Sequence, residues 1–406
     1  MKTTSGHPLT TYGLIGYALT AGFSISLSQI CLGLAFLGLF RSLFRNSEPV
    51  PWAGFEHAYF GFALACLLSL PQASDSYKAF AEMRKILIIL VFSTSFGAVL
   101  TSSMRRIVIG CLVGAGAVAA VAGPLKTLFL HGAWERTTGF FSLPLTFAEC
   151  QMIFIVITLR WLVIPQESTK IRWFLWGAFV MQIFGFFAAF TRGAVIGLVL
   201  GLLSMFRRNP KALAVILCVT VLSISSLAFL TRSMTNRQDA FDTSAATPDG
   251  LNNIRLRIWS IGLTILAEHP VFGVGMNNVK PHYRSRVTPA EREKNWVYGH
   301  LHNTFLQILT MTGMFGLVAF FWFWAAISRW CLMVASSDLP LWERGMAEAA
   351  FPVIVAFLGS GLTEYSFGDE EVAMLAFFSI GLLTNAYRDF APGNSAPASE
   401  PIEKTA

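Results

Sequence analysis

A histidine at the start of an apolar run is the residue of this sequence best suited to proton transfer. His302 opens the stretch HNTFLQILTMTGMFG, between the longest polar segment of the chain and a run apolar enough to cross a bilayer. Histidine has the side chain whose ordinary pKa lies nearest neutral pH, so it can act as a general base. We expect Asn303 to cap a helix that starts at Thr304, which leaves His302 just outside that helix. A lone histidine is often structural instead, and His300 would point nearly the opposite way if both were helical.

Arginines that could bind a phosphate group occur in segments that we place on the same side of the membrane as His302. The planar guanidinium group matches two phosphate oxygens at once. We predict that Arg192, in the stretch FTRG, and Arg255 bind a substrate diphosphate, although an arginine at a membrane boundary often extends to lipid head groups instead. Arg255 and Arg257 lie about 200° apart around a helix, so only one of them can face the site. The secondary candidates for the site are Asn303, Arg257, Arg136 and Arg84.

The sequence offers no recognisable metal site, and we predict neither a metal nor another cofactor. It contains no HExxH and no DxD motif. No carboxylate in the loops on the side of His302 stands out as a nucleophile, and the predicted neighbours of His302 are all cationic. The acidic cluster at 368–371 is better explained as a cap of the last helix. Glu149 is a carboxylate inside a predicted membrane span, and it keeps a transport function open as an alternative.

The composition indicates a membrane protein with many spans. The 406 residues are 54% hydrophobic and 13% charged, whereas a soluble domain carries roughly a quarter of charged residues. The formal net charge is +7, but no run of Lys and Arg follows the pattern of a nucleic-acid site, so we predict membrane lipids and no nucleic acid among the partners.

Apolar runs predict an all-α polytopic membrane protein with about 12 transmembrane helices. The run from 10 to 43 is too long for one span, and three serines interrupt its middle, so we divide it into two helices. Positive charge in the short loops favours a cytoplasmic location for both termini. The other ten predicted spans are 55–70, 86–100, 107–122, 143–164, 173–190, 193–206, 212–230, 304–327, 349–362 and 372–387.

A long polar segment divides the predicted spans into two groups. We expect spans 1–9 in residues 1–230, a periplasmic loop at 231–303, spans 10–12 in 304–388 and a disordered cytoplasmic tail at 389–406. Within the loop, residues 231–253 indicate irregular structure. Isoleucines at 254, 258, 261 and 265 then predict an amphipathic helix, lying on the membrane or on the protein. His269-Pro270 should end this helix, and GVG at 273–275 should form a sharp turn.

Three stretches of the sequence resemble one known family. The motif is a histidine, then Asn, Ser or Gln, nine residues, Gly, two residues and a further Gly or similar residue; His302, Asn303, Gly313 and Gly316 match it without departure. FTRGAVIG around Arg192 and RLRIW…EHPVFGVG at 255–275 are similar to the family as well. The sequence resembles the O-antigen ligases, within the wider family of membrane O-antigen ligases and polymerases. The resemblance covers about 192–316, and elsewhere it extends only to the predicted topology.

This resemblance implies a fold and an activity. It implies a metal-independent glycosyltransferase similar to the C superfamily, in the inner membrane of a Gram-negative bacterium. Such an enzyme moves O-antigen from undecaprenyl diphosphate, the donor, to a sugar hydroxyl of lipid A–core, the acceptor, at the periplasmic face. We expect His302 to act as the base, Arg192 and Arg255 to stabilise the leaving diphosphate, and the anomeric centre to be inverted.

Three other functions remain open at this stage. An O-antigen polymerase uses the same donor with a second lipid-linked glycan as acceptor. A protein O-oligosaccharyltransferase transfers from the same donor to Ser or Thr. A transporter or flippase needs a polar pathway through the spans, and Glu149 and Arg160 lie inside one of them.

Overall fold

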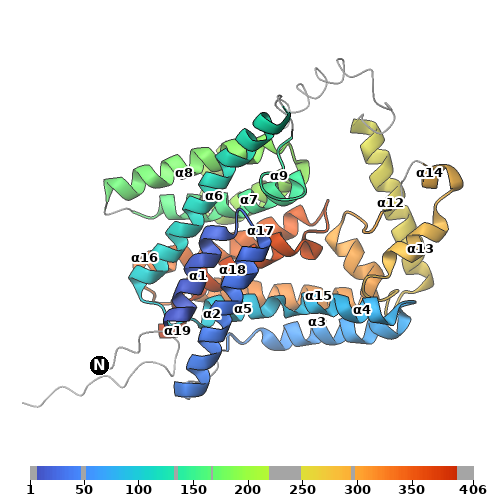
Figure 1. Cartoon of the computed structure of the whole chain (residues 1–406), viewed down its shortest axis with the longest axis horizontal. Helices are drawn as coiled ribbons and strands as arrows, with labels where there is room; N and C mark the ends of the chain where they lie inside the picture. Colours follow the sequence, from blue (N-terminus) through green and yellow to red (C-terminus); the bar gives the residue numbers. More distant parts are fainter. Residues whose placement is uncertain are drawn as a thin grey trace, which may run out of the picture.

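A computed structural model describes residues 7–46, 52–131, 136–165, 168–218, 248–293 and 298–390. All regular elements in these ranges are helices. Five of them are long and apolar enough to cross a membrane: Ile25–Phe44, Ser102–Leu130, Pro144–Val163, Thr169–Ala188 and Thr304–Ala335. The described part of the chain is therefore all-helical, and its apolar helices indicate a membrane protein with several spans (Figure 1).

Most helices of the first part of the chain coincide with predicted spans. The long apolar run at 10–43 is divided into two helices, as predicted, and the break lies beside Ser24. These helices are α1 (Pro8–Thr20), α2 (Ile25–Asn46), α3 (Glu56–Ser69), α4 (Ser76–Glu82), α5 (Ile89–Gly97), α6 (Ser102–His131), α7 (Pro144–Val163), α8 (Thr169–Ala188) and α9 (Arg192–Met205), with 3-10 turns η1 (Leu70–Gln72) and η2 (Met83–Ile88).

The second part contains a group of helices at one end of the molecule and then a long kinked helix. Helices α12 (Pro248–Glu268), α13 (Val279–Arg286) and α14 (Pro289–Glu293) form the group, at the right of Figure 1. They are followed by α15 (Thr304–Ala335), α16 (Leu341–Ala347), α17 (Ala350–Ser360), η3 (Ser366–Gly368), α18 (Glu370–Thr384) and α19 (Tyr387–Phe390).

Several predicted boundaries need correction. The span predicted at 86–100 begins with a 3-10 turn, so its α-helix is only Ile89–Gly97. Residues 248–253 belong to α12 and not to a loop, because Pro248 suits the first turn of a helix. Asp389 and Phe390 finish α19 and are not part of a disordered tail. Residues 231–247 of the predicted loop, the end of the span at 212–230 and the tail beyond 390 lie outside the described residues.

Small residues bring α9 and α17 into close contact. A Cβ atom on Gly197 would lie 2.5 Å from the carbonyl oxygen of Ala356, and one on Gly201 would lie 2.8 Å from the Cβ of that alanine. Glycine thus allows the two backbones to approach, as is common between membrane helices. This packing brings the start of α9 and the end of α17 together.

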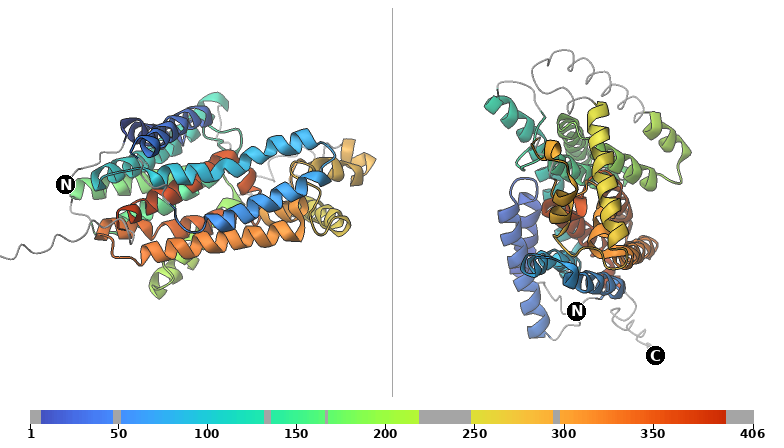
Figure 2. Two further views of the ribbon diagram at one scale, coloured as in Figure 1. Left: turned by 90° about the horizontal axis from the view of Figure 1, so that it is seen from below. Right: turned by 90° about the vertical axis from the view of Figure 1, so that its right-hand side faces the viewer.

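Helix α15 packs along α3 through aromatic side chains. The ring of Phe323 lies 5.0 Å from that of Tyr59 and 6.2 Å from that of Phe55. Both views of Figure 2 show the two helices side by side. Packing on α3 therefore fixes the position of α15 in the helical bundle.

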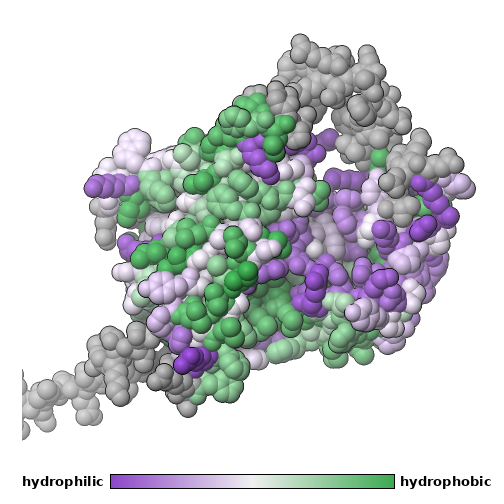
Figure 3. All heavy atoms as spheres, viewed as in Figure 1, coloured by the Kyte–Doolittle hydropathy of each residue, from purple (hydrophilic) through white to green (hydrophobic). Residues whose placement is uncertain are grey.

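The amphipathic helix α12 lies on the protein. Ile258, Ile261 and Ile265 are at most 2% exposed, and a Cβ on Gly262 would lie 2.8 Å from Leu301. The apolar stripe predicted for this helix is confirmed, and it covers the start of α15. Figure 3 shows hydrophilic residues concentrated at this end, whereas hydrophobic residues cover the face formed by α1, α2 and α6.

Candidate functional site

The start of α15 is fixed to the turn that follows α17. Asn303 caps α15, as predicted, because its Oδ1 accepts a hydrogen bond from the backbone N–H of Leu306 at 2.9 Å. Its Nδ2 donates to the carbonyl of Leu362 at 2.8 Å. The backbone N–H of Thr304 donates to the carbonyl of Gly361 at 2.7 Å. Both functional groups of Asn303 therefore take part in positioning the start of α15.

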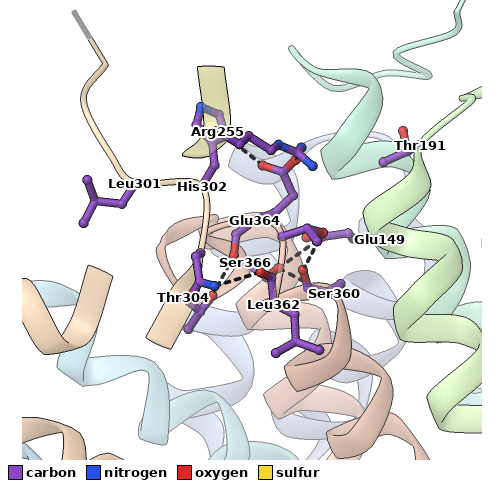
Figure 4. Close-up of polar contacts among 12 residues, drawn as sticks. Glu149, Thr191, Arg255, Leu301, His302, Thr304, Ser360, Leu362, Glu364 and Ser366 are labelled. Atoms are coloured by element: carbon purple, nitrogen blue, oxygen red, sulfur yellow. Dashed lines mark hydrogen bonds and ion pairs between the residues drawn. The ribbon is translucent and has the colours of Figure 1, made fainter. Parts of the chain in front are cut away.

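His302 stands just outside the helix and contacts a carboxylate. Its backbone is left-handed, with φ 47°, which turns the side chain away from the axis of α15. Its Nδ1 lies 2.9 Å from Oε2 of Glu364, and the other carboxylate oxygen of Glu364 accepts from Nη2 of Arg255 (Figure 4). Glu364 is buried, with a side chain 7% exposed, whereas the side chain of His302 is 26% exposed.

The contact with Glu364 decides which nitrogen of His302 is available. An ionised carboxylate only accepts hydrogen bonds, so its partner Nδ1 carries the hydrogen atom. The lone pair of a neutral His302 is then on Nε2, the nitrogen that can take a proton from a substrate. In many enzymes a carboxylate orients the imidazole of the histidine that acts as general base, and the same arrangement occurs here.

Glu364 is the site residue that sequence reasoning missed. From the sequence we expect only cationic neighbours for His302, but the structure places an anion between His302 and Arg255. The available signal was the position of Glu364, directly after the apolar run 349–362 and on the same predicted side as His302. Nothing in the local sequence distinguished it from the acidic residues at 369–371.

The two arginines of α12 point in different directions, as predicted. Arg255 reaches Glu364. Arg257 instead donates to Glu291 at 3.0 Å, and this hydrogen bond is the main reason why the pKa of Glu291 falls to about 2. Arg257 therefore holds α14 against α12 and lies away from His302.

Arg136 lies against the residues that precede α9. Nε of Arg136 donates to the carbonyl of Ala189 at 3.1 Å, and its Nη2 donates to Thr191 Oγ1 at 3.3 Å. Burial lowers the pKa of Arg136, the charge of Glu364 raises it, and the charge of Arg192 lowers it. These charges are thus near one another, so the structure brings Arg136 toward the site.

Arg192 itself is exposed and begins α9. Within the described residues, no ion pair or side-chain hydrogen bond holds its guanidinium group. The next residue, Gly193, lies against the turn that carries Glu364, since a Cβ there would be 2.5 Å from Thr363 Oγ1 and 3.4 Å from Cγ of Glu364. The start of α9 therefore borders the site, and the N–H groups of a helix start favour an anion.

Arg84 lies elsewhere. It forms an exposed ion pair with Glu370 at 2.9 Å, at the mouth of a cavity of about 240 Å³ between α2, α5 and α18. Asp369 in the same acidic cluster caps α18 by accepting from the N–H of Val372 at 3.4 Å, so the predicted capping role is confirmed. The structure does not bring Arg84 to His302.

A docked loop interrupts α15 at Gly313. This glycine has φ 67° and ψ −170°, inside an otherwise helical segment. The backbone bonds that residues 314 and 315 would make in a continuous helix are replaced by bonds to the loop at 270–275. The replacements are Val274 N to Thr310 O (3.0 Å), Gly275 N to Met311 O (2.9 Å), Met314 N to Pro270 O (2.9 Å) and Phe315 N to Val271 O (3.3 Å).

The docked loop explains why glycines occur at these positions. A Cβ on Gly313 would lie 2.1 Å from the carbonyl oxygen of Val271, and one on Gly273 would lie 2.4 Å from the backbone of Met311. The predicted GVG turn is confirmed by the positive φ values of Gly273 and Gly275, 66° and 92°. Because the loop continues α12, its docking fixes the position of Arg255 relative to His302.

His300 packs directly against His302. Their ring centroids are 4.2 Å apart, and Nδ1 of His300 is buried without a hydrogen-bond partner in the described residues. Burial and, to a lesser extent, His302 lower the pKa of His300 from 6.5 to about 4, against the opposing effect of Glu364. His300 is therefore uncharged at neutral pH.

This pKa shift predicts a stability that depends on pH. Between about 6.5 and about 4 the unfolded chain binds a proton at His300 and the folded chain does not, so the free energy of unfolding should fall as the pH falls through this window. We expect a contribution on the order of 1–3 kcal/mol. Thermal unfolding in detergent at a series of pH values should show a smaller acid-induced loss for His300→Gln than for the wild type. Parallel curves for the two proteins would contradict this prediction.

The site and the fold define a class of protein: a helical membrane protein with a histidine, a carboxylate and arginines gathered at one polar end. In the described part of the chain, no three His, Cys, Asp or Glu side chains are grouped so as to hold a metal ion. Residues 177–321 match the model of a protein family described as O-antigen ligase, and this match supports assignment of the chain to the O-antigen ligase family. The family predicted from the His302 motif is confirmed. A search of curated proteins finds no match.

Proposed function

We propose that the protein is an O-antigen ligase that transfers O-antigen polysaccharide from undecaprenyl diphosphate to a sugar hydroxyl of lipid A–core. The observation that carries this proposal is the contact of His302 Nδ1 with Glu364, which leaves Nε2 as a base on a partly exposed side chain. The family match over 177–321 includes His302, Arg192 and Arg255, and it supports a ligase or polymerase type of activity.

In the proposed reaction, the acceptor hydroxyl attacks the anomeric carbon of the donor sugar. Nε2 of His302 takes the hydroxyl proton as the new C–O bond forms, and Glu364 stabilises the resulting imidazolium. Such proton transfer typically contributes roughly 10²–10⁴-fold to the rate. The bond between the anomeric carbon and the diphosphate oxygen breaks, and its electron pair leaves with the diphosphate. A single displacement of this kind inverts the anomeric centre.

The leaving diphosphate needs positive charge, which arginines can supply without a metal ion. Arg192 is exposed at the start of α9, and its guanidinium group is available for a phosphate. Arg255 has donors beyond the one that Glu364 accepts. Fixed positive charges that face the developing negative charge lower the barrier. Arg136 and the N–H groups at the start of α9 would complete the anion site.

The proposed topology follows from the same assignment. We propose twelve spans in a C-superfamily-like arrangement in the inner membrane of a Gram-negative bacterium. Both termini then lie in the cytoplasm, and the site lies at the periplasmic face. The positive charge of the short loops supports this orientation. Labelling of single cysteines introduced at exposed positions such as Ser285 and Asp338, in intact cells, should modify the first and not the second. The reverse pattern would invert the topology.

The experiment that tests the function is reconstitution of the purified protein in liposomes with defined substrates. Undecaprenyl diphosphate-linked glycan and lipid A–core are supplied with EDTA present, and the joined product is detected by mass spectrometry. We expect lipid A–core that carries the glycan. A longer lipid-linked glycan would instead identify a polymerase, and glycan on Ser or Thr of a supplied protein would identify an O-oligosaccharyltransferase. Movement of the lipid-linked glycan without any transfer would identify a carrier.

A comparison of the two α12 arginines tests the diphosphate site. Arg255→Ala should lower kcat/KM for the donor by about tenfold, because it removes a charge-assisted contact and leaves Glu364 without its partner. Arg257→Ala is the matched control on the same helix, and it should change kcat/KM less than twofold since its partner is the distant Glu291. Steady-state transfer at several donor concentrations measures both values. Equal losses in the two variants would remove Arg255 from the site.

A further inference from the structure

Glu149 is a fully buried carboxylate that the proposed reaction does not use. It lies in α7 with 0% of its surface exposed. One oxygen, Oε1, accepts a hydrogen bond from Oγ of Ser366 at 2.7 Å, and the other has no hydrogen-bond partner in the described part of the chain. Burying a carboxyl group with one oxygen unpaired is unfavourable, so its other contacts must compensate.

Two buried serines connect Glu149 to the turn after α17. Oγ of Ser366 is 3.0 Å from Oγ of Ser360, and both serines are at most 1% exposed. The carbonyl of Ser360 accepts from the backbone N–H groups of Thr363 and Glu364, each at 3.1 Å. The contacts from Glu149 through Ser366 to Ser360 therefore join the turn at 360–366 to α7 (Figure 4).

The start of α15 holds the same turn from the side opposite Glu149. Oγ1 of Thr304 donates to the carbonyl of Glu364 at 2.9 Å, and Asn303 donates to Leu362 at 2.8 Å. Glu364 thus projects from a turn that is supported from two sides. One support is the start of α15, whose cap Asn303 directly follows His302. The other support, through Ser366 and Glu149, connects the turn to α7.

We infer that Glu149 is a positioning residue that places the carboxylate of Glu364 at Nδ1 of His302 by anchoring the 360–366 turn through Ser366. The requirement is for a hydrogen-bond acceptor of this shape, which the amide of glutamine also provides. A charge or a mobile proton on Glu149 has no part in this role. The effect of Glu149 on glycosyl transfer rests on the proposed function, but its effect on the contact between Glu364 and His302 does not.

Four variants and one control test the inference in the reconstituted transfer reaction. Glu149→Gln should keep kcat within threefold of the wild type. Glu149→Leu should lower kcat at least tenfold, with KM for donor and acceptor changed less than threefold. Glu364→Gln should also lower kcat, and the double variant Glu149→Leu/Glu364→Gln should lose little more than Glu364→Gln alone, because both changes act on the same contact.

The control is another buried polar side chain of the membrane helices. Gln182 in α8 is 0% exposed and donates to the carbonyl of Val113 at 3.0 Å, so Gln182→Leu removes a buried hydrogen bond away from the turn. Its effect on kcat should be the same in the wild-type and Glu364→Gln backgrounds. A loss for Glu149→Leu that is likewise equal in both backgrounds would reduce Glu149 to a general contribution to stability and overturn the inference.

A second readout does not depend on the reaction. In protein labelled with ¹⁵N at histidine, the His302 signals, assigned by their absence from His302→Gln, report the hydrogen on Nδ1. We expect Glu149→Leu to change these signals and Glu149→Gln to leave them as in the wild type. Unchanged signals in Glu149→Leu would overturn the inference even if transfer is absent, and so would a Glu149→Gln variant as inactive as Glu149→Leu. Failure of the proposed function would appear separately, as missing product from the wild type with these signals behaving as expected.

Discussion

Replacement of His302 with alanine should lower the steady-state rate of glycan transfer at least 100-fold. The substitution removes the only imidazole whose Nε2 is oriented by a carboxylate among the described residues, and general base catalysis contributes roughly 10²–10⁴-fold. The loss should appear in kcat, because the hydroxyl proton is removed only in the transition state, whereas KM for the donor should change little. The measurement is transfer by purified variant in liposomes, with the same amount of folded protein in each sample.

The control for this prediction is a histidine in the same polar end of the molecule. His282 lies in α13 and contacts His269 edge to face, with ring centroids 5.4 Å apart, so His282→Ala tests the loss of an imidazole outside the site. Its activity should remain within about threefold of the wild type. His302→Ala with activity close to that of His282→Ala would exclude His302 as the base and would leave only its positioning contacts to explain the motif.

The parts of the fold that could be predicted from the sequence are those set by near neighbours in the chain. The cap at Asn303 depends on residues three positions apart. The divergence of Arg255 and Arg257 follows from the helical repeat alone, and the buried isoleucines of α12 follow from the same periodicity. The division of residues 10–43 into two helices follows from length and from the serines at its middle.

The parts that could not be predicted depend on contacts between distant segments. Glu364 is 62 residues from His302, and the position of its turn depends on the packing of α17 on α9 and on contacts with α7 and α15. The sequence contains several acidic residues close to Glu364, and hydropathy does not separate them. The 3-10 turn at 83–88 and the early start of α12 are likewise details of packing that apolar runs do not encode.

The structure explains the spacing between Asn303 and Gly313 in the His302 motif. Gly313 and Gly316 resemble helix-packing glycines in the sequence, and the nine residues between Asn303 and Gly313 have no chemical meaning by themselves. In the structure these nine residues form the part of α15 before the kink, and Gly313 is where the loop at 270–275 docks. The spacing therefore corresponds to the length of helix between the proposed base and the loop that follows α12, the helix that carries Arg255.

Substitution of Gly313 with alanine should consequently lower the rate of transfer, although Gly313 does not contact the site residues. The backbone of Gly313, with φ 67° and ψ −170°, belongs to a region that only glycine adopts readily and that costs other residues about 1–3 kcal/mol. The added Cβ would also lie 2.1 Å from the carbonyl oxygen of Val271, so the loop must move. Since the loop and α12 form one segment, we expect Arg255 to shift away from Glu364 and transfer to fall at least about tenfold, the loss expected for Arg255→Ala.

Hydrogen exchange locates this effect. The N–H groups of Val274 and Gly275, which donate to α15 in the wild type, should exchange much faster in Gly313→Ala, while amides of α7 should keep their protection. Gly177→Ala in α8 is the matched control, because a Cβ there meets no atom within 4 Å, and alanine is the better helix former. It should be neutral in both measurements. Protected amides at 274 and 275 together with full activity in Gly313→Ala would mean that the kink tolerates a side chain, and the docked loop would then not be what positions Arg255.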